Sequence, residues 1–315
     1  MFTAGKVSEA VVRVENGTIA EVGRTDLGPA DRTITLAPGQ TLVPAAVDTL
    51  CALRDWGEAE RDTVETATKA ALAGGITVVC DQSNTVPRLD SVELVRKRSE
   101  FVAARSYVDF GIQPHPPRDP AQLDEYRAAG AFAVSLWQWD LRPWNFPRDS
   151  DDSSATFRRY AELGLKGLVF PDELAFRETP LEDRAETYAL QALLRRMDPG
   201  FQARIFVTLA ESVERLLAEK ERLPQLLVQI APHYLFMSHE AAHERIGSAA
   251  AHSPPLRSAA EVARLQEYAA AGKFDILVSH PTAHRTVDKH SSEPIPGEFT
   301  PKRGFSSVDF AYPLY

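Results

Sequence analysis

The chain has 315 residues, of which 44% are hydrophobic and 25% are charged. This composition is typical of a globular protein and excludes disordered, collagen-like and coiled-coil chains. The 44 acidic residues outnumber the 35 basic ones, and the net charge of −9 argues against binding to nucleic acids or membrane surfaces. Two cysteines are too few for a disulfide framework, and neither a signal peptide nor a long apolar run is evident. We therefore expect a cytoplasmic protein.

The first 44 residues are predicted to form a small β appendage, an incomplete β-sandwich. Four short strands are expected, at residues 10–14, 19–22, 34–36 and 41–43. Asn16-Gly17 separates the first two, and this pair is the strongest short signal for a tight hairpin turn. Unpaired strand edges need to be covered by a loop, a partner or a second copy, so this appendage predicts association with another chain.

Residues 45–315 alternate between predicted strands and helices. Apolar runs occur at residues 45–49, 76–80, 107–112, 132–136, 165–170, 203–208, 226–230 and 274–279. Amphipathic helical patterns occur at residues 58–73, 91–104, 120–129, 155–163, 181–197, 211–221 and 258–271. Eight strands alternating with helices predict a (β/α)8 TIM barrel. The alternative is a doubly wound open sheet, but the first strand is not followed by a glycine fingerprint.

Several motifs in chain order resemble the dihydroorotase and hydantoinase branch of the amidohydrolases. The matching segments are residues 10–23, 37–55, 70–87, 130–137, 230–238, 253–258, 273–284 and 304–314. The resemblance spans nearly the whole chain and implies a TIM barrel with an N-terminal β appendage. It also implies hydrolysis or closure of cyclic amides by an enzyme whose bound metals generate the attacking hydroxide.

The resemblance implies six metal-ligand positions at the ends of the barrel strands. They are two histidines on the first strand, a carboxylated lysine on the fourth, histidines on the fifth and sixth, and an aspartate on the eighth. In this sequence these positions fall on Leu50, Ala52, Ser135, Phe170, Leu209 (or the adjacent Thr208) and Ser279. Zinc needs about four nitrogen, oxygen or sulfur donors. The sequence therefore predicts that this site binds no metal, and we expect no cofactor.

A second set of family positions is kept in this sequence. The resemblance implies that Arg54, Asn84 and His284 correspond to groups that hold the substrate carboxylate in dihydroorotases. An arginine, an amide and an imidazole can bind a carboxylate without a metal. These three residues are therefore a candidate vestigial carboxylate site, although Arg54 could instead pair with the nearby Asp55 or Asp81.

His239 to His243 spell the H-E-x-x-H pattern of zinc proteases, which places two imidazoles on one face of a helix. The motif needs a third ligand, for which Glu261 or Glu267 can be nominated, and coincidence remains the alternative. His233 follows the seventh predicted strand, where a structural hydrogen bond is favoured over catalysis. Cys51 lies between the two lost histidine positions and is expected to pack rather than to act as a nucleophile.

The residues at the strand ends favour a catalytically inactive dihydroorotase-like protein with a structural or regulatory role. The resemblance implies pyrimidine biosynthesis as the setting, with aspartate transcarbamoylase or an active dihydroorotase as a possible partner, or a homo-oligomer. Two alternatives remain open. One is an active hydrolase of cyclic amides, and the other is a sensor that binds a carboxylate ligand at Arg54, Asn84 and His284.

Overall fold

The computed structural model describes residues 1–3, 6–82, 85–137, 152–171, 185–250, 254–280 and 283. The chain divides into two compact units, Met1–Ala46 and Val47–Tyr315. Across the described residues, every helix is too short or too polar to cross a lipid bilayer.

The first unit contains two antiparallel strand pairs. Strand β1 (Phe2–Thr3) pairs with β2 (Lys6–Val7), and β3 (Val11–Glu15) pairs with β4 (Thr18–Gly23). The turn between β3 and β4 consists of Asn16 (φ 51°) and Gly17 (φ 75°), both in the left-handed region that this hairpin turn requires. The predicted hairpin is therefore confirmed, whereas the pairing of β1 with β2 was not predicted.

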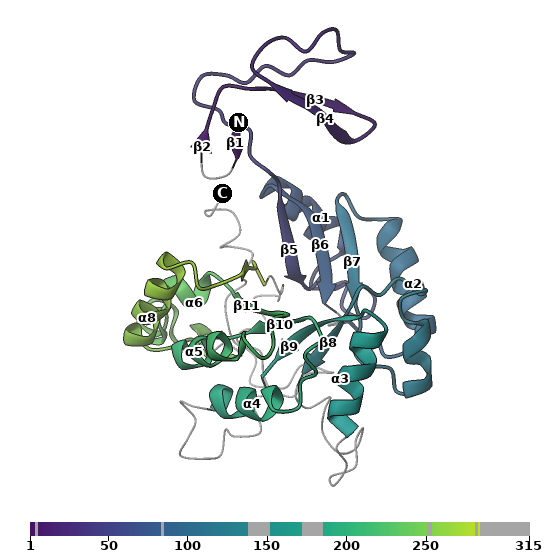
Figure 1. Cartoon of the computed structure of the whole chain (residues 1–315), viewed down its shortest axis with the longest axis vertical. Coiled ribbons are helices and arrows are strands. Elements are labelled where there is room, and N and C mark those ends of the chain that lie inside the picture. Colours follow the sequence, from purple (N-terminus) through teal and green to yellow (C-terminus); the bar gives the residue numbers. More distant parts are fainter. Residues whose placement is uncertain are drawn as a thin grey trace. The chain divides into compact units, whose positions relative to one another are not determined.

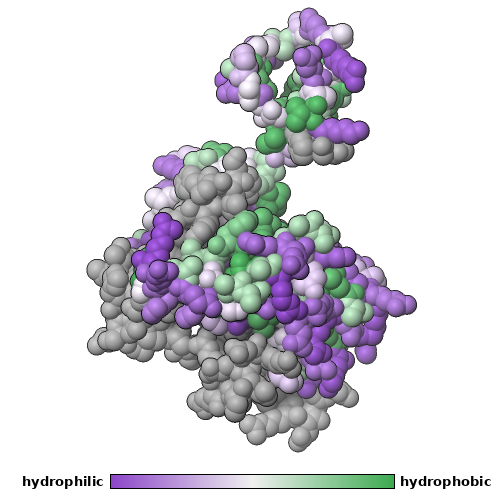
Figure 2. Space-filling model, turned by 90° about the vertical axis from the view of Figure 1, so that its left-hand side faces the viewer, coloured by the Kyte–Doolittle hydropathy of each residue, from purple (hydrophilic) through white to green (hydrophobic). Residues whose placement is uncertain are grey.

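The strands predicted at residues 34–36 and 41–43 are absent from the structure, so that prediction was wrong. Both segments are irregular, and their apolar side chains face solvent, with Ile34 72% and Val43 56% exposed. A β-branched run becomes a strand only where a neighbouring strand pairs with it, and in the described unit none does. Figure 2 shows that apolar groups (green) lie on the surface of this unit beside hydrophilic ones.

The second unit is a (β/α)8 barrel, as predicted. Its described strands follow one another in chain order: β5 (Ala46–Cys51), β6 (Ile76–Gln82), β7 (Asp109–Gln113), β8 (Ala133–Trp137), β9 (Lys166–Phe170), β10 (Ala203–Phe206), β11 (Leu226–Ile230) and β12 (Ile276–Leu277). Strands β5 to β7 form one sheet and β8 to β12 another. A parallel bridge between Ile112 and Ala131 joins the two sheets (Figure 1).

Side chains from the first strand reach the last two strands and close the ring. The Thr49 hydroxyl on β5 donates to Oε1 of Gln229 on β11 at 3.1 Å. The Ser279 hydroxyl, just after β12, donates to the carboxylate of Asp48 on β5. Inside the ring, Arg204 donates to the carbonyl of Thr49 at 3.0 Å and to the side chain of Gln113. The barrel is thus filled and crosslinked rather than hollow.

Helices lie around the outside of the strands (Figure 1). The described helices are α1 (Val64–Ala73), α2 (Val92–Ala103), α3 (Asp152–Glu162), α4 (Ala185–Leu194), α5 (Ala210–Glu219), α6 (His233–Phe236), α7 (His239–Ile246) and α8 (Ala259–Ala270), with 3-10 turns at Pro120–Glu125 and Gly247–Ala250. The predicted helix at 58–73 begins only at Val64, after the Thr63 N-cap. Its first residues instead form a turn, in which Glu58 pairs with two arginines.

Candidate active site

The six positions to which the resemblance assigns metal ligands lie at or near the carboxyl ends of their strands, where chemistry occurs in this fold. Leu50 and Ser135 lie within β5 and β8 and are fully buried; Ala52 directly follows β5 and is 4% exposed. Phe170 ends β9, and Leu209 follows β10 as the N-cap residue of α5. Ser279 follows β12 and is half-buried.

The side chains at these positions do not fit a divalent metal ion. Leucine, alanine and phenylalanine carry no donor atom, and the Ser279 hydroxyl is already bonded to Asp48. The Ser135 hydroxyl is buried, with no hydrogen-bond partner among the described residues, and a neutral hydroxyl is a poor zinc ligand. In the described ranges, no group of three or more His, Cys, Asp or Glu side chains is arranged so that it could hold a metal ion.

Aromatic and imidazole rings pack at the ends of β9 to β12. The ring centroids of Phe170 and Phe206 are 5.6 Å apart, and that of His280 lies 5.1 Å from Phe206. His233 is fully buried, with its ring 6.1 Å from His280 and 4.3 Å from Tyr234. These five residues are called the ring cluster below. His233 thus packs within the protein, in a structural rather than an exposed catalytic setting.

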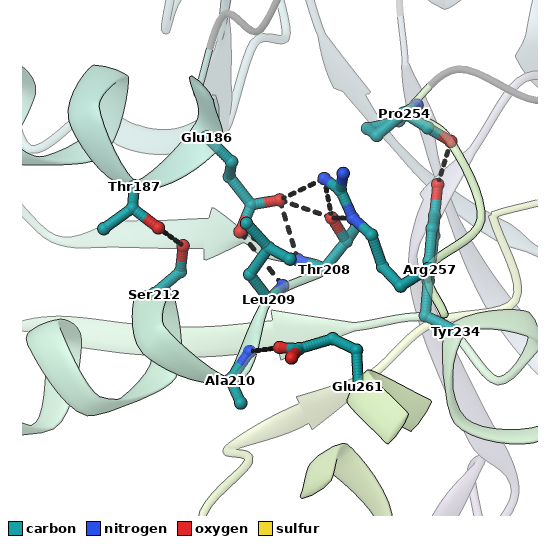
Figure 3. A network of polar contacts seen from close by, with 10 residues as sticks. All are labelled: Glu186, Thr187, Thr208, Leu209, Ala210, Ser212, Tyr234, Pro254, Arg257 and Glu261. Atoms are coloured by element: carbon teal, nitrogen blue, oxygen red, sulfur yellow. Dashed lines mark hydrogen bonds and ion pairs between the residues drawn. The ribbon is translucent and has the colours of Figure 1, made fainter. Parts of the chain in front are cut away.

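A buried ion pair lies beside the ring cluster, at the start of α5 (Figure 3). The Glu186 carboxylate accepts the backbone N–H groups of Thr208 (2.9 and 3.1 Å) and Leu209 (3.1 Å). Arg257 donates to the Thr208 hydroxyl at 2.9 and 2.6 Å, and lies 3.3 Å from Glu186. Leu209 cannot cap α5 with its own side chain. Glu186 instead binds the two N–H groups just before the helix, and Glu261 accepts the N–H of its first residue, Ala210.

Charged residues occupy the other side of the barrel mouth, at the ends of β5 and β6. Arg54 is 1% exposed and donates to Glu58 at 2.7 Å, and Arg61 donates to the other oxygen of Glu58 at 2.5 Å. Arg98 donates to Asp81 at 2.8 Å, and both side chains are fully buried. Arg54 therefore already binds a carboxylate of its own chain, that of Glu58.

The Arg54 backbone begins an uncommon left-handed turn. Arg54, Asp55 and Trp56 have φ values of 48°, 69° and 54°, a region that non-glycine residues seldom adopt, least of all in succession. Trp56 extends over Arg98, with the guanidinium carbon 5.2 Å from its ring centroid. The turn thus covers the Asp81–Arg98 pair with an aromatic side chain. Of the other two predicted carboxylate-binding residues, Asn84 and His284 lie outside the described residues.

Asp48 and Cys51 lie on β5, the first strand of the barrel. Burial raises the pKa of the Asp48 carboxyl from 3.8 to about 6, although hydrogen bonds from Ser279 and from the Leu50 backbone oppose this shift. Burial also raises the pKa of the Cys51 thiol well above its ordinary value. A buried thiol that keeps its proton is a poor nucleophile, which agrees with a packing role for Cys51.

The H-E-x-x-H segment forms α7, and both imidazoles are exposed. Glu240 accepts the backbone N–H of Ala259 at 3.1 Å, and Glu261 accepts that of Ala210. Both carboxylates are therefore engaged elsewhere. Glu267, the other nominated ligand, joins no three-residue metal cluster in the described ranges. The geometry does not bring together the three ligands and the free base that a zinc protease requires.

The chain is similar to curated dihydroorotases along its full length. It is 26% identical to the dihydroorotase of Archaeoglobus fulgidus, over 100% of this chain and 74% of that protein. It is 27% identical to the dihydroorotase of Thermococcus kodakarensis, over 93% of this chain and 69% of that protein. These relatives support a resemblance of the chain to the dihydroorotase and hydantoinase branch of the amidohydrolases. No family model matches the chain.

Solved structures of this branch share the fold. L-hydantoinase from Arthrobacter aurescens superposes with a TM-score of 0.76 at 23% identity, over 89% of this chain and 67% of that one. Dihydroorotase from Saccharomyces cerevisiae, in complex with 5-fluoroorotic acid, gives a TM-score of 0.64 at 15% identity, over 85% and 76% of the two chains. At these identities the likeness establishes the barrel and leaves the chemistry to be argued from the residues.

The site positions that the resemblance implies stay a prediction, and two residues that lie beside them in the structure were not predicted as part of the site. Glu186 had no predicted role, and Arg257 was noted only as part of a matching motif. The two are 71 residues apart, and only the barrel brings them together. The sequence offers one signal for Glu186. It is a glutamate on a predicted helix, and the next predicted helix begins after an apolar residue that cannot cap it.

Proposed function

We propose that this chain is a catalytically inactive, dihydroorotase-like protein with a structural or regulatory role. The observation that carries this proposal is the chemistry of the barrel mouth. Leu50, Ala52 and Phe170 stand where the resemblance implies histidine ligands, and all three are buried. Hydrocarbon side chains that pack in this way provide no donors for a metal and no group that activates water.

The charges that remain at the mouth also support inactivity. Arg54 would bind a substrate carboxylate in the family, but Glu58 lies 2.7 Å from it in a buried pair. A free ligand would have to displace a carboxylate held at high effective concentration by its own chain. The carboxylate-sensor alternative therefore depends on Arg54 exchanging partners, and it stays a prediction.

We further propose that the protein acts by binding another chain, in pyrimidine biosynthesis. The dihydroorotases it is similar to suggest this setting. Aspartate transcarbamoylase, an active dihydroorotase or a second copy of this chain are the candidate partners. The first unit supports association because Val7, Val14 and Ile19 are each at least 60% exposed, and exposed apolar groups of this kind favour an interface.

A turnover assay tests the main proposal directly. Purified protein is incubated with dihydroorotate and with hydantoins, with and without added Zn²⁺, and the Archaeoglobus fulgidus dihydroorotase serves as the positive control. We expect no turnover above the buffer rate under either condition. Turnover that depends on stoichiometric zinc would contradict the proposal and establish the active-hydrolase alternative instead.

Light scattering of the protein, alone and mixed with each candidate partner, tests the proposed association. A monomer in every mixture would contradict it.

A further inference from the structure

Two exposed imidazoles lie side by side on α7, in the segment that follows the carboxyl end of β11. The rings of His239 and His243 are 6.0 Å apart between centroids and are inclined by only 22°. Both belong to exposed residues, one helical turn apart, so their side chains can rotate freely toward a common point. Metal–nitrogen bonds of about 2.0–2.1 Å are within reach of two rings at this separation after small side-chain rotations.

The helix that carries the two rings is held in place at its first turn. Ser238 caps it by accepting the Ala241 N–H at 3.2 Å. The His239 N–H donates to the carbonyl of Arg257 at 2.7 Å, and Glu240 accepts the Ala259 N–H at 3.1 Å. These contacts fix the backbone of both histidines before any ligand arrives. A preorganised pair loses less conformational freedom on binding than two histidines on a flexible segment would lose.

We propose that His239 and His243 form a two-imidazole binding site for a divalent transition-metal ion such as Cu²⁺, Ni²⁺ or Zn²⁺. Imidazole suits these ions, whereas Mg²⁺ prefers oxygen ligands, and the order of affinity should place Cu²⁺ first. Water completes the coordination sphere. The site binds and does not hydrolyse, because Glu240 points its carboxylate at Ala259 and is not available as a general base.

Metal binding at this site should stabilise the fold around it. An ion held by two residues of α7 favours the helical state of that segment over the unfolded state. The first turn of α7 is in turn bonded to Arg257, which belongs to the buried ion pair at the barrel mouth. The proposed site lies outside the positions where the family would hold its metals, and it is independent of whether the barrel is catalytically active.

Isothermal titration of the full-length chain with Cu²⁺, Ni²⁺, Zn²⁺ and Mg²⁺ tests the proposal. We expect one tightly bound transition-metal ion per chain and no detectable Mg²⁺ binding. Replacing either histidine, as His239→Ala or His243→Ala, should weaken binding on the order of 100-fold, since a bidentate site becomes monodentate. Both residues are exposed, and far-ultraviolet circular dichroism of each variant confirms that it is folded.

A matched variant separates the geometry from the number of histidines. His243→Ala combined with Glu244→His keeps two exposed imidazoles but moves one by about 100° around the helix. We expect it to bind as weakly as His243→Ala alone. Wild-type affinity in this variant, or in either single variant, would overturn the proposal. An ion bound with unchanged affinity by the double variant His239→Ala/His243→Ala would likewise overturn this proposal, whereas the turnover assay tests the inactive barrel separately.

Discussion

The two sides of the barrel mouth differ in the chemistry of the side chains that fill them. At the ends of β9 to β12, the ring cluster replaces donors with rings that pack against one another. At the ends of β5 and β6, charged side chains remain, and two arginines there have internal counterions, in the Arg54–Glu58 and Asp81–Arg98 pairs. The difference teaches that, if the proposed inactivity holds, the two sides reach it by different routes: apolar substitution on one side and neutralisation of charges on the other. The two sides should respond differently to mutation. Removing one partner of a buried ion pair leaves an unpaired charge and strongly lowers the free energy of unfolding, whereas packed rings carry no such charge.

The largest effect is expected from removing one member of the Asp81–Arg98 pair. Arg98→Ala leaves the buried Asp81 carboxylate without its cation, which should lower the free energy of unfolding by about 3–5 kcal/mol. Urea denaturation of the variant measures this change. Arg118→Ala is the matched control, since Arg118 pairs with Asp90 but is 82% exposed, and it should have little effect. Equal losses in both variants would remove the distinction between buried and exposed pairs.

Asp48 makes the charged side sensitive to pH. The folded state keeps the Asp48 proton up to about pH 6, whereas an unfolded carboxyl releases it near its ordinary pKa of 3.8. The folded state thus binds more protons between these values, so stability should fall as the pH rises from about 4 to 6. Asp48→Asn removes this titrating group. The fall in the free energy of unfolding between pH 4 and pH 7 should then be smaller by up to about 3 kcal/mol. Urea melts of both proteins at pH 4 and pH 7 provide the measurement. Parallel profiles would show that Asp48 is not responsible.

A substitution of Glu58 tests whether Arg54 can bind an external anion once its internal carboxylate partner is removed. Glu58→Gln removes the carboxylate shared by Arg54 and Arg61 and should lower the free energy of unfolding by about 1–3 kcal/mol. It should also leave Arg54 able to accept an external anion. Calorimetry with orotate should then show binding to the variant and not to the wild-type chain. Binding to the wild-type chain that Arg54→Ala abolishes would favour the carboxylate sensor over internal neutralisation.

The barrel itself could be predicted because its signals are local. Apolar runs of the length of a strand alternate with amphipathic segments, and glycines such as Gly75 (φ 79°) and Gly272 (φ 65°) lie where helices end. The Asn16-Gly17 turn likewise needs only its own two residues to adopt positive φ. The conformations of these turns follow from the residues within them, and their positions were therefore predicted correctly.

The errors occurred where partners are distant in sequence or missing. Residues 34–36 have strand composition but no strand beside them in the described unit. Glu58 looks like the start of a helix, yet Arg54 and Arg61 hold it in a turn. The Glu186–Arg257 pair depends on the closure of the barrel. The resemblance indicates the positions at which metal-donor side chains are expected and absent. Only the three-dimensional structure identifies the counterions of the charged residues near them, such as Glu58 for Arg54.

The smallest effect is expected on the ring side, where volume matters more than charge. Phe170→Leu keeps an apolar side chain of similar reach and should cost less than about 1.5 kcal/mol. Because no charge is exposed or removed, the loss should be the same at pH 4 and pH 7 and at low and high salt, in contrast with the Asp48 and Glu58 variants. Urea denaturation under these four conditions measures it. A loss that varied with pH or salt would mean that ionised groups contribute to the stability of the ring side as well.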